Sequence, residues 1–534
     1  MNYIYFYIRS TPFVVYFFLF LFPSTPIFSQ KIQWQQSIGG KQGDYLFDII
    51  STPDHGFLLA GSSLSKSSDL TDSHFKNKNS SLDYFLWKMN RSGILEWQKK
   101  LGGDRSDYLY SVNLTRDGGY ILGGSSYSSF FRDKKDSCRG EDDYWIIKLN
   151  AYGNEEWQKT LGGTGSDKLL SIEQTWDGGY IVGGSSDSPP SYEKLEDSRG
   201  AMDFWICKLD SKGQIEWQKT LGGSGYDLLR RIKATSDGYI LAGYSNSPKS
   251  GEKSENTMGQ GDFWLVKLDH NGYKLWDKTI GGHLDDELMD LIITSDGNYL
   301  LAGSSNSPQE GNKTALQGNG SDIWLVKTNR QGEILWQKSF DIGRIDTPNK
   351  IKETKKGNIL ISGNTIQSNT NGEIQSDYLV IKISESGDEI WRKQLGGPKR
   401  DWLQNTVETT DGYLLLAGTS DSPKGNDKTV ETNGQTDFWI VKLQNEDDHF
   451  KTFEIKEMDA YPNPTERFVN VIIYKELSGT ETIYVHDITG KLLQQNKIKS
   501  GTTPIDLGEY TPGVYILSIT LSNERTHTLK ILKI

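Results

Sequence analysis

The feature that most constrains the fold of this chain is a seven-residue segment that recurs about every sixty residues. WQKTLGG occurs at residues 157–163 and again at 217–223, and relaxed copies bring the number of units to seven. The tryptophans of the seven copies are Trp34, Trp97, Trp157, Trp217, Trp276, Trp336 and Trp391. A fixed period of this length indicates an array of structural repeats rather than a series of unrelated domains.

Each unit is predicted to form four short β-strands. In the third complete unit these are residues 167–175, 180–186, 203–210 and 214–220, separated by a WDGG turn, a long polar loop and a tight SKG turn. Four antiparallel strands in about sixty residues are typical of one β-propeller blade. We therefore predict an all-β chain with a seven-bladed β-propeller over residues 30–443.

The register of the repeat also predicts how the propeller closes. Residues 31–38 form an outer strand that has no blade of its own, whereas the last unit ends after residues 437–443 without an outer strand. Propellers commonly pair one terminus into the blade of the other terminus, because this removes exposed sheet edges. We expect residues 31–38 to complete the seventh blade.

Three polar or small positions recur along the array, and repetition within one chain is evidence about fold before chemistry. The second strand of each unit carries a glycine, where we expect the blades to approach too closely for a side chain. In the third strand of each unit a lysine follows an aspartate by five residues, as in Asp203 and Lys208. A further aspartate follows each GG pair; these are Asp44, Asp107, Asp167, Asp227, Asp286, Asp346 and Asp401. Either these carboxylates hold a cation, or each caps backbone N–H groups of its own turn or pairs with a lysine; we favour the second alternative.

Two regions are candidates for ligand binding. The first is the face that carries the long loops and the GG crossings, because specificity often resides on loops held by a rigid scaffold. Its side chains could stack on a sugar or could equally be ordinary surface residues. They are Tyr127, Phe130, Phe131, Arg132, Tyr192, Tyr244 and Trp402. The second region is the central channel. Its polar candidates are Asp48, Arg231, Asp290 and Lys350. These side chains either contact a polar ligand or form ion pairs along a narrow channel, and we favour the ion pairs.

Catalytic patterns are absent from the sequence. The seven histidines are scattered, and there is no HExxH segment, GxSxG elbow, P-loop or dinucleotide fingerprint. Cys138 and Cys207 lie in different units, so we expect them to stay unpaired, and two cysteines cannot form a cysteine zinc site. We expect no metal, no cofactor and no enzymatic activity. The alternative is a secreted propeller enzyme, a polysaccharide lyase or hydrolase.

The N-terminus and the charge balance predict an exported protein. Residues 1–29 carry a single charge, Arg9, and an apolar run over residues 13–22 that is too short to span a bilayer, which indicates a cleavable signal peptide. We expect no transmembrane segment in the mature chain. With 59 Lys and Arg against 70 Asp and Glu, the net charge of −11 argues against nucleic acid or an anionic membrane as partner.

The array as a whole resembles the secreted bacterial propeller-repeat proteins with WQKTLGG and DGGYIVGG units, a group without an activity that carries over. The hairpin LDSKGQIEW at residues 209–217 also resembles quinoprotein-like propellers. It lacks the adjacent cysteine pair of the quinone-binding enzymes. This second resemblance therefore supports the fold and implies no cofactor.

The C-terminal part differs from the array. After a polar linker at residues 444–458, alternating apolar residues with turns predict a small β-sandwich of about seven strands. Its motifs are YPNP, VNVII, IYVHDITGKLL, PGVY and THTLKILKI, in which YPNP is Tyr461, Pro462, Asn463 and Pro464, and PGVY begins with Pro512 and Gly513.

These motifs resemble the type A C-terminal sorting domain of the type IX secretion system of Gram-negative bacteria. The resemblance implies that residues 459–534 are an address read by the outer-membrane translocon, commonly removed on passage and sometimes exchanged for a lipopolysaccharide anchor. The alternative is a carbohydrate-binding sandwich. We expect delivery through the periplasm to the cell surface or the medium, where the propeller binds a glycan or a protein; a purely structural surface protein is a third possibility.

Overall fold

The computed structural model describes residues 30–65, 81–368, 374–409, 411–445, 458–473, 481–498, 502–520 and 526–534. The predicted signal peptide and most of the predicted linker lie outside these residues. Every regular element in the described ranges is a β-strand, in agreement with the all-β prediction.

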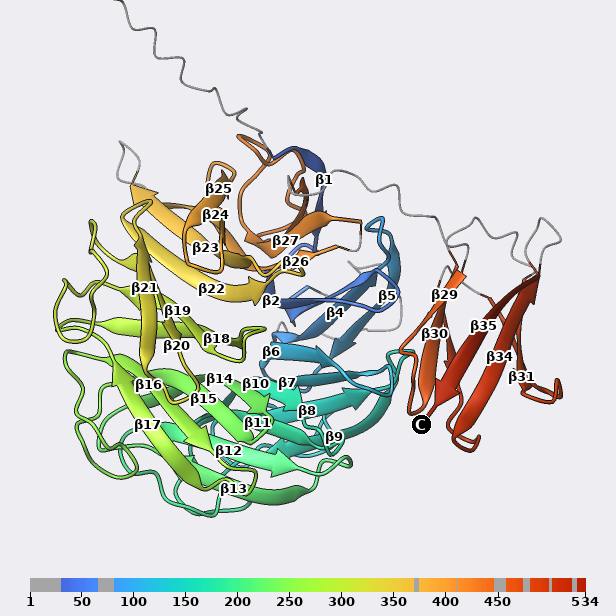
Figure 1. Cartoon of the computed structure of the whole chain (residues 1–534), viewed down its shortest axis with the longest axis horizontal. Coiled ribbons are helices and arrows are strands. Elements are labelled where there is room, and N and C mark those ends of the chain that lie inside the picture. The colour runs from blue at the N-terminus through green and yellow to red at the C-terminus, as the bar shows by residue number, and fades with distance from the viewer. Residues whose placement is uncertain are drawn as a thin grey trace, which may run out of the picture.

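The N-terminal part consists of antiparallel four-stranded sheets that match the repeat units. In the third sheet, β10 (Asp167–Gln174), β11 (Tyr180–Ser186), β12 (Asp203–Leu209) and β13 (Ile215–Leu221) lie in this order. β11 and β12 are buried along their whole length, as expected for middle strands of a sheet that is covered on both faces. The first strands of consecutive sheets contact one another and lie toward the centre of the arrangement (Figure 1).

The other sheets repeat this pattern. The first two are β2 (Asp44–Ser51), β3 (Phe57–Ser63), β4 (Asp83–Met89) and β5 (Leu95–Leu101), then β6 (Asp107–Leu114), β7 (Tyr120–Ser126), β8 (Asp143–Leu149) and β9 (Glu155–Leu161). The fourth and fifth are β14 (Asp227–Thr235), β15 (Gly238–Ser245), β16 (Asp262–Leu268) and β17 (Lys274–Ile280), then β18 (Asp286–Ile293), β19 (Tyr299–Ser305), β20 (Asp322–Thr328) and β21 (Ile334–Phe340). The sixth is β22 (Ile345–Glu353), β23 (Ile359–Ser368), β24 (Ile374–Ile383) and β25 (Glu389–Leu395).

The last sheet takes its fourth strand from the N-terminus. It is made of β26 (Asp401–Glu408), β27 (Tyr413–Ser420), β28 (Asp437–Gln444) and β1 (Ile32–Ile38). β1 pairs antiparallel with β28, from Ile38 opposite Phe438 to Ile32 opposite Leu443. Residues 31–38 therefore occupy the outer-strand position that the register predicts.

Apolar clusters join each sheet to the next one. Tyr144 and Trp205 from adjoining sheets are both fully buried, and the Tyr144 hydroxyl donates a hydrogen bond of 2.9 Å to the Trp205 carbonyl oxygen. One cluster contains Leu46 and Phe85 of the first sheet together with Val407 and Phe438 of the last. Apolar burial of this kind, at roughly 25 cal/mol per Å², is the main stabilising contribution in such a sheet stack.

The second-strand glycines lie at close backbone contacts. A Cβ added at Gly184 or Gly243 would overlap the backbone oxygen of Lys168 or Leu228, on the first strand of the same sheet. At Gly243 the next contact is the Phe204 ring of the preceding sheet. The expected close contact between neighbouring sheets is therefore present at Gly243, but the nearest atom to each glycine belongs to the first strand of the same sheet.

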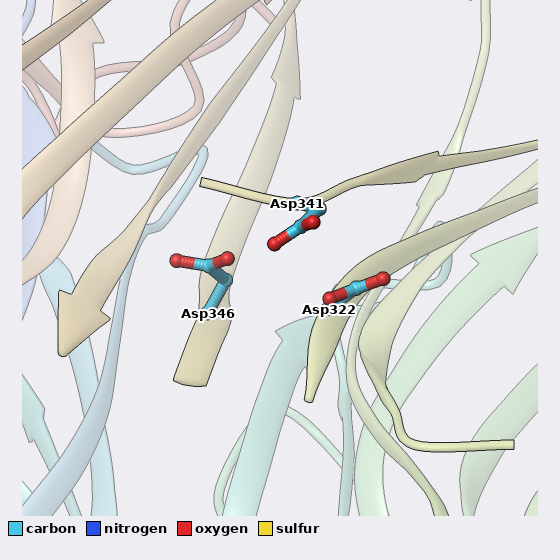
Figure 2. Close-up of side chains that lie close together, drawn as sticks. All are labelled: Asp322, Asp341 and Asp346. Atoms are coloured by element: carbon cyan, nitrogen blue, oxygen red, sulfur yellow. The ribbon is translucent and has the colours of Figure 1, made fainter. Parts of the chain in front are cut away.

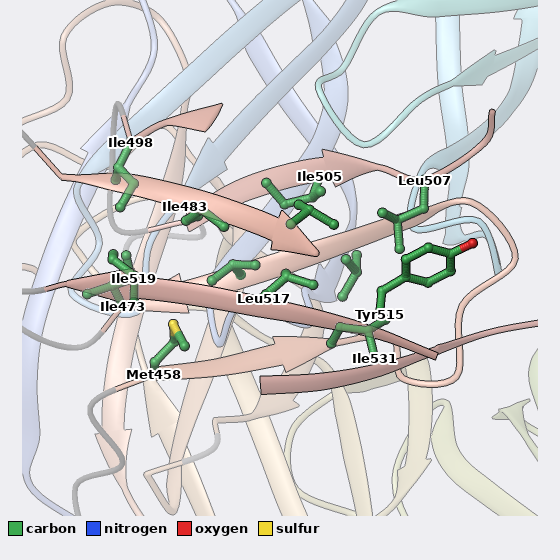
Figure 3. Close-up of a cluster of buried hydrophobic side chains, with 13 residues drawn as sticks. Met458, Ile473, Ile483, Ile498, Ile505, Leu507, Tyr515, Leu517, Ile519 and Ile531 are labelled. Carbon is green, nitrogen blue, oxygen red and sulfur yellow. The ribbon is translucent and has the colours of Figure 1, made fainter. Parts of the chain in front are cut away.

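The C-terminal part forms two antiparallel sheets. One contains β29 (Met458–Tyr461), β30 (Phe468–Ile473) and β33 (Thr502–Asp506). The other contains β32 (Leu492–Lys497), β31 (Thr482–Asp487), β34 (Gly513–Thr520) and β35 (Thr526–Lys533). Residues of both sheets form one apolar core, in which Ile483, Ile505 and Leu517 are fully buried (Figure 3).

Candidate binding face, central channel and sorting domain

In five of the described sheets, a buried lysine holds the long loop that follows the second strand. Lys194 is fully buried, its Nζ donates to Thr220 Oγ1 at 2.8 Å, and it lies 6.0 Å from the centroid of the Trp205 ring. Burial lowers the pKa of Lys194, while Asp167 and Asp203 oppose this shift. Equivalent buried lysines lie over the third-strand tryptophan in four more sheets; they are Lys134, Lys253, Lys313 and Lys428. Sequence reasoning missed this set, although each lysine follows a recurring serine by six residues.

The aspartates that follow the GG pairs cap the crossings between sheets. Asp227 Oδ2 accepts hydrogen bonds from the Gly223 N–H at 2.7 Å and from Ser247 Oγ at 2.8 Å. The same two bonds occur at Asp44, Asp107, Asp167, Asp286 and Asp401. The capping alternative is therefore confirmed for these residues.

A second aspartate lies across the same crossing, on the third strand of the preceding sheet. Asp203 accepts a hydrogen bond from the Arg199 N–H. Burial, followed by the like charge of Asp227, raises the pKa of Asp203 to about 6. The Oδ1 atoms of Asp203 and Asp227 are buried and have no hydrogen-bond partner in the part of the chain that the structure describes. Each such junction thus holds two buried carboxylates, an arrangement that sequence reasoning did not anticipate.

The recurring third-strand lysines do not pair with the aspartate five residues earlier. Lys208 instead lies 2.7 Å from Asp177 in the first turn and 2.7 Å from Glu216 on the outer strand. Because the aspartate and the lysine lie near opposite ends of β12, each contacts groups at its own end of the sheet. The cause is geometric, since five residues of a strand span roughly 17 Å.

The paired carboxylates predict a pH dependence of stability. Burial first, then the neighbouring carboxylate, raises the pKa of Asp143 to about 7 and of Asp262 to about 6. The pKa of a carboxyl in the unfolded chain is about 3.9. Between these values the folded chain binds more protons than the unfolded chain, so the free energy of unfolding rises as the pH falls from about 7 to about 4.

We therefore expect a higher melting temperature at about pH 5 than at about pH 8, measured by calorimetry at constant ionic strength. Asp143→Asn removes one of the titrating groups and is expected to flatten the dependence. Below about pH 4 the trend reverses, because Lys208 holds the pKa of Asp177 at about 2, and this carboxyl takes up its proton in the unfolded chain first. A melting temperature that falls steadily between pH 8 and pH 5 would contradict the carboxylate assignment.

The predicted loop-face residues lie on several sheets. Phe130 and Phe131 are exposed in the loop of the second sheet, and the Arg132 guanidinium lies 5.0 Å from the Phe131 ring centroid. Tyr192, in the loop of the third sheet, is 65 % exposed, with Arg139 of the preceding loop 5.8 Å from its ring centroid. Arg139 also makes an ion pair of 2.9 Å with Glu193, which ties these two loops together.

The other two predicted aromatics are apart from this group. Tyr244 ends β15, and burial followed by the nearby Asp285 raises the pKa of its hydroxyl to about 12. Trp402 lies on β26, with Arg400 5.2 Å from its ring centroid. The structure thus brings Phe130, Phe131, Arg132 and Tyr192 to adjoining loops and leaves Tyr244 and Trp402 on other sheets.

The loop residues Arg132 and Tyr192 have an unusual backbone. Their φ angles are 53° and 49°, in the left-handed region. The equivalent positions of the fourth, fifth and seventh loops are Gly251, Gly311 and Asn426, residue types that tolerate this conformation. A bulky side chain with this φ is a genuine outlier.

A half-buried aromatic group on the inner strands was also missed. Tyr108 and Tyr110 of β6 stack with ring centroids 6.0 Å apart, and Tyr110 contacts Phe47 of β2 edge-on at 5.1 Å. Tyr127, which the sequence did predict as a loop-face aromatic, lies at the start of the long loop with its ring centroid 6.3 Å from that of Tyr108. The available sequence signal was an aromatic residue at the same two first-strand positions of the first two units.

The predicted channel residues form ion pairs. Arg231 Nε lies 2.6 Å from Asp290 Oδ1, and Lys350 Nζ lies 3.7 Å from Asp48 Oδ2. Asn405 Nδ2 donates to Asp48 Oδ1 at 3.1 Å. Burial, followed by the positive charge of Arg231, lowers the pKa of Lys350. The geometry agrees with the ion-pair interpretation, because each of these charges already has a partner.

The two cysteines are free, as expected, with Cys138 half-buried and Cys207 fully buried. Burial raises the pKa of Cys138 to about 12 and that of Cys207 well above its usual value. A thiol kept protonated in this way is a poor nucleophile.

In the C-terminal part, the predicted YPNP motif holds the last strand. Asn463 Nδ2 donates to the Lys530 carbonyl oxygen at 2.8 Å, and Asn463 Oδ1 accepts from the Leu532 N–H at 2.9 Å. The peptide bonds before Pro462 and Pro464 are both cis. Pro512 lies in the bend before β34, and Gly513 is the first residue of that strand. Residues 459–533 match the sequence profile of a family described as "Secretion system C-terminal sorting domain".

The C-terminal unit is a secretion sorting domain. A chain with this domain is exported to the cell surface or the medium, as the motifs predicted. No helix among the described residues has the length and the apolar character that a membrane crossing requires.

The sorting domain contacts the second sheet of the array through a few groups. Arg467 makes an ion pair of 2.6 Å with Glu156, and the Phe468 N–H donates to the Asp117 carbonyl oxygen at 3.0 Å. The Tyr152 hydroxyl donates to the Pro504 carbonyl oxygen at 2.6 Å. A cavity of about 450 Å³ lies at this contact, away from the loop face.

Comparisons with other proteins cover the array more weakly. Regulatory protein FlaEY of Caulobacter vibrioides is 25% identical over 181 residues, which are 32% of this chain and 19% of the relative. This chain therefore spans about a fifth of that relative's length.

Among solved structures, Sqt1 from Chaetomium thermophilum aligns with 78% of this chain and 100% of its own at 11% identity, with a TM-score of 0.39. PorZ, a surface component of the type IX secretion system of Porphyromonas gingivalis, aligns with 94% of this chain and 86% of its own at 9% identity, with a TM-score of 0.25. With TM-scores below 0.5, neither likeness bears on function.

Proposed function

We propose that this protein is an exported binding module that holds a glycan through the loops of its second and third sheets. The observation that carries the proposal is the left-handed backbone of Arg132 and Tyr192. An L-residue in this region costs roughly 1–2 kcal/mol, whereas glycine adopts it freely. The array uses Gly251 and Gly311 at the same loop position, so the two bulky side chains are retained at a cost, as is common at functional sites.

The side chains on these two loops suit a sugar ligand. Phe131 and Tyr192 present flat apolar surfaces, and each has a guanidinium beside it. That of Arg132 can donate hydrogen bonds to hydroxyl or carboxylate oxygens, whereas Arg139 already donates to Asp136, Ser137 and Glu193. Arg139 joins the two loops through Glu193, so that the group is held in place before a ligand arrives. Such preorganisation reduces the entropy cost of binding. A protein ligand is the alternative for the same surface.

The proposed architecture of the mature protein is a closed seven-bladed propeller over residues 30–443, a linker over 444–458 and the sorting domain over 459–534. Support for closure comes from the pairing of β1 with β28 and from the apolar cluster shared by the first and last sheets. Residues 1–29 serve as a signal peptide. The type IX translocon reads the sorting domain, which is then removed or exchanged for a lipopolysaccharide anchor.

The test is a glycan and polysaccharide binding screen on the purified chain, with reducing-sugar release followed in the same wells. We expect saturable binding without release. Release of sugar would contradict a binding role without catalysis and would support the alternative, a polysaccharide lyase or hydrolase. Silence in both readouts, together with self-association, would favour a structural surface protein.

A further inference from the structure

One crossing between sheets departs from the repeat. Six crossings contain a glycine directly after the outer strand; these are Gly39, Gly102, Gly162, Gly222, Gly281 and Gly396. Between the fifth and sixth sheets the same position is Asp341. This substitution places a third carboxylate at a junction that already contains Asp322 and Asp346, the two aspartates of the repeat.

The glycine at the other crossings lies against a carboxylate. A Cβ added at Gly222 or Gly281 would overlap Oδ1 of Asp203 or Asp262, on the third strand of the preceding sheet. At the other crossings this position has space only for the hydrogen of a glycine, whereas here it carries the side chain of Asp341. Such a crowded position is an unfavourable place for an additional negative charge unless a cation is present.

The three carboxylates converge at this junction. One oxygen from each of Asp322, Asp341 and Asp346 lies within 4.8 Å of the others, and the three side chains point toward a common space (Figure 2). Asp346 Oδ2 accepts hydrogen bonds from the Ile342 and Gly343 N–H groups at 2.8 and 3.0 Å. Asp341 is exposed, which leaves the group open to solvent on one side.

Asp322 contributes a buried carboxylate to this group. It is 0 % exposed, and its Oδ2 accepts the Gly318 N–H at 2.6 Å. Its Oδ1 is buried without a hydrogen-bond partner anywhere in the described ranges. Among the described residues, Asp203 has the same unpaired oxygen at its crossing, but at this junction the Asp341 carboxylate lies beside that of Asp322 as well.

Lysine compensation also differs at this junction. The carboxylates Asp203 and Asp227 lie between Lys194 and Lys253, the buried loop lysines of the third and fourth sheets. At the junction of the fifth and sixth sheets, Lys313 compensates Asp322 from one side, but residues 366–376 of the sixth unit contain no lysine. Arg344 is exposed and makes no ion pair with any described residue. Three carboxylates therefore face one buried lysine.

We propose that Asp322, Asp341 and Asp346 bind a Ca²⁺ ion at the junction of the fifth and sixth sheets. The donors are all carboxylate oxygens, the ligands that hard cations prefer, and no nitrogen or sulfur donor belongs to the group. Ca²⁺ accepts six to eight oxygen ligands in flexible geometry, so water on the exposed side of Asp341 can complete the shell. Mg²⁺ requires near-ideal octahedral geometry, which a site with one exposed loop residue does not impose.

The test is calorimetric titration of the full secreted chain with CaCl₂ after removal of bound ions with a chelator. We expect one site with a Kd on the order of 10⁻⁴–10⁻³ M, the range of extracellular calcium sites. Asp341→Gly restores the residue of the other six crossings and is expected to weaken binding at least about tenfold without lowering the melting temperature in chelator. Asp322→Asn, which removes the buried charge, is expected to weaken binding as much.

The control is Asp197→Asn, which removes one exposed carboxylate from the loop of the third sheet and should leave the titration unchanged. An equal heat of Ca²⁺ binding in Asp341→Gly and in the unmodified chain would overturn the proposed site. The absence of a saturable signal up to about 10 mM, tenfold above the expected range, would do the same. Binding of Mg²⁺ as tight as that of Ca²⁺ would overturn the assignment of the ion.

Discussion

A chain that begins at Lys41 instead of Gln30 is expected to lose the folded ring. The truncation removes β1, so β28 becomes an edge strand with the sequence DFWIVKLQ, which is mostly apolar and has no net charge. The truncation also removes Ile38 from the apolar cluster between the first and last sheets, together with Trp34, which packs against that cluster. We expect the free energy of unfolding to fall by at least about 3–5 kcal/mol, the cost of deleting one large buried side chain.

Side-chain bonds of β1 add to this loss. Gln35 Nε2 donates to the Asp427 carbonyl oxygen at 2.7 Å, and Gln35 Oε1 accepts from Trp439 Nε1 at 3.2 Å, so the truncation leaves a buried indole N–H unpaired. The exposed edge should also promote aggregation. Denaturant titration and size-exclusion chromatography compare the two chains, with a synthetic peptide of residues 31–38 as rescue. An unchanged unfolding midpoint and a monomeric elution for the shorter chain would show that β1 is dispensable.

The second large effect is expected from a chain that ends at Asn445. Without the sorting domain, the protein should disappear from the medium and the cell surface and accumulate inside the cell envelope, as measured by immunoblots of cell fractions. The ring itself should keep its melting temperature, because it contacts the sorting domain through few groups, such as Arg467 with Glu156 and Tyr152 with Pro504. Secretion of this shorter chain at the level of the full chain would contradict the assignment of the address.

A point variant makes this prediction sharper. Asn463→Ala leaves the Lys530 carbonyl oxygen and the Leu532 N–H without their side-chain partner, at a cost of about 1 kcal/mol per bond. We expect a loosened last strand and reduced secretion. Lys491→Ala, an exposed residue in a turn of the same domain, is the matched control and should be secreted normally.

The sequence predicted the strands and the position of β1 because a repeat can be aligned with itself. The boundaries of β10 to β13 agree with the predicted segments to within about one residue, since Gly and Asp turns separate them. The order of motifs likewise predicted the sorting domain. In these cases the information is local, and each segment shows its own period and its own turn residues.

Contacts between units could not be predicted in the same way. Asp203 and Asp227 meet across a crossing because the packing of consecutive sheets brings the third strand of one sheet beside the first strand of the next. Periodicity shows that both residues recur, but it does not show which recurring residues meet. For the same reason Lys208 was not assigned to Asp177 and Glu216, and the position of Lys194 beneath its loop was missed. The left-handed backbone of Tyr192 is invisible in sequence, because a tyrosine does not indicate positive φ.

The most direct test of the account compares two faces of the ring. Using the glycan that binds best in the screen, the affinity is measured for the unmodified chain, Phe131→Ala and Tyr192→Ala, and for Trp176→Ala as control. Trp176 is 77 % exposed and also has an arginine beside it, Arg116 at 5.5 Å, but it lies in a first turn on the opposite face. We expect each loop variant to weaken binding about tenfold or more, the loss of roughly 1.4 kcal/mol, while Trp176→Ala binds as the unmodified chain does. Equal affinity in the loop variants, or a loss confined to Trp176→Ala, would contradict a binding site on the loop face.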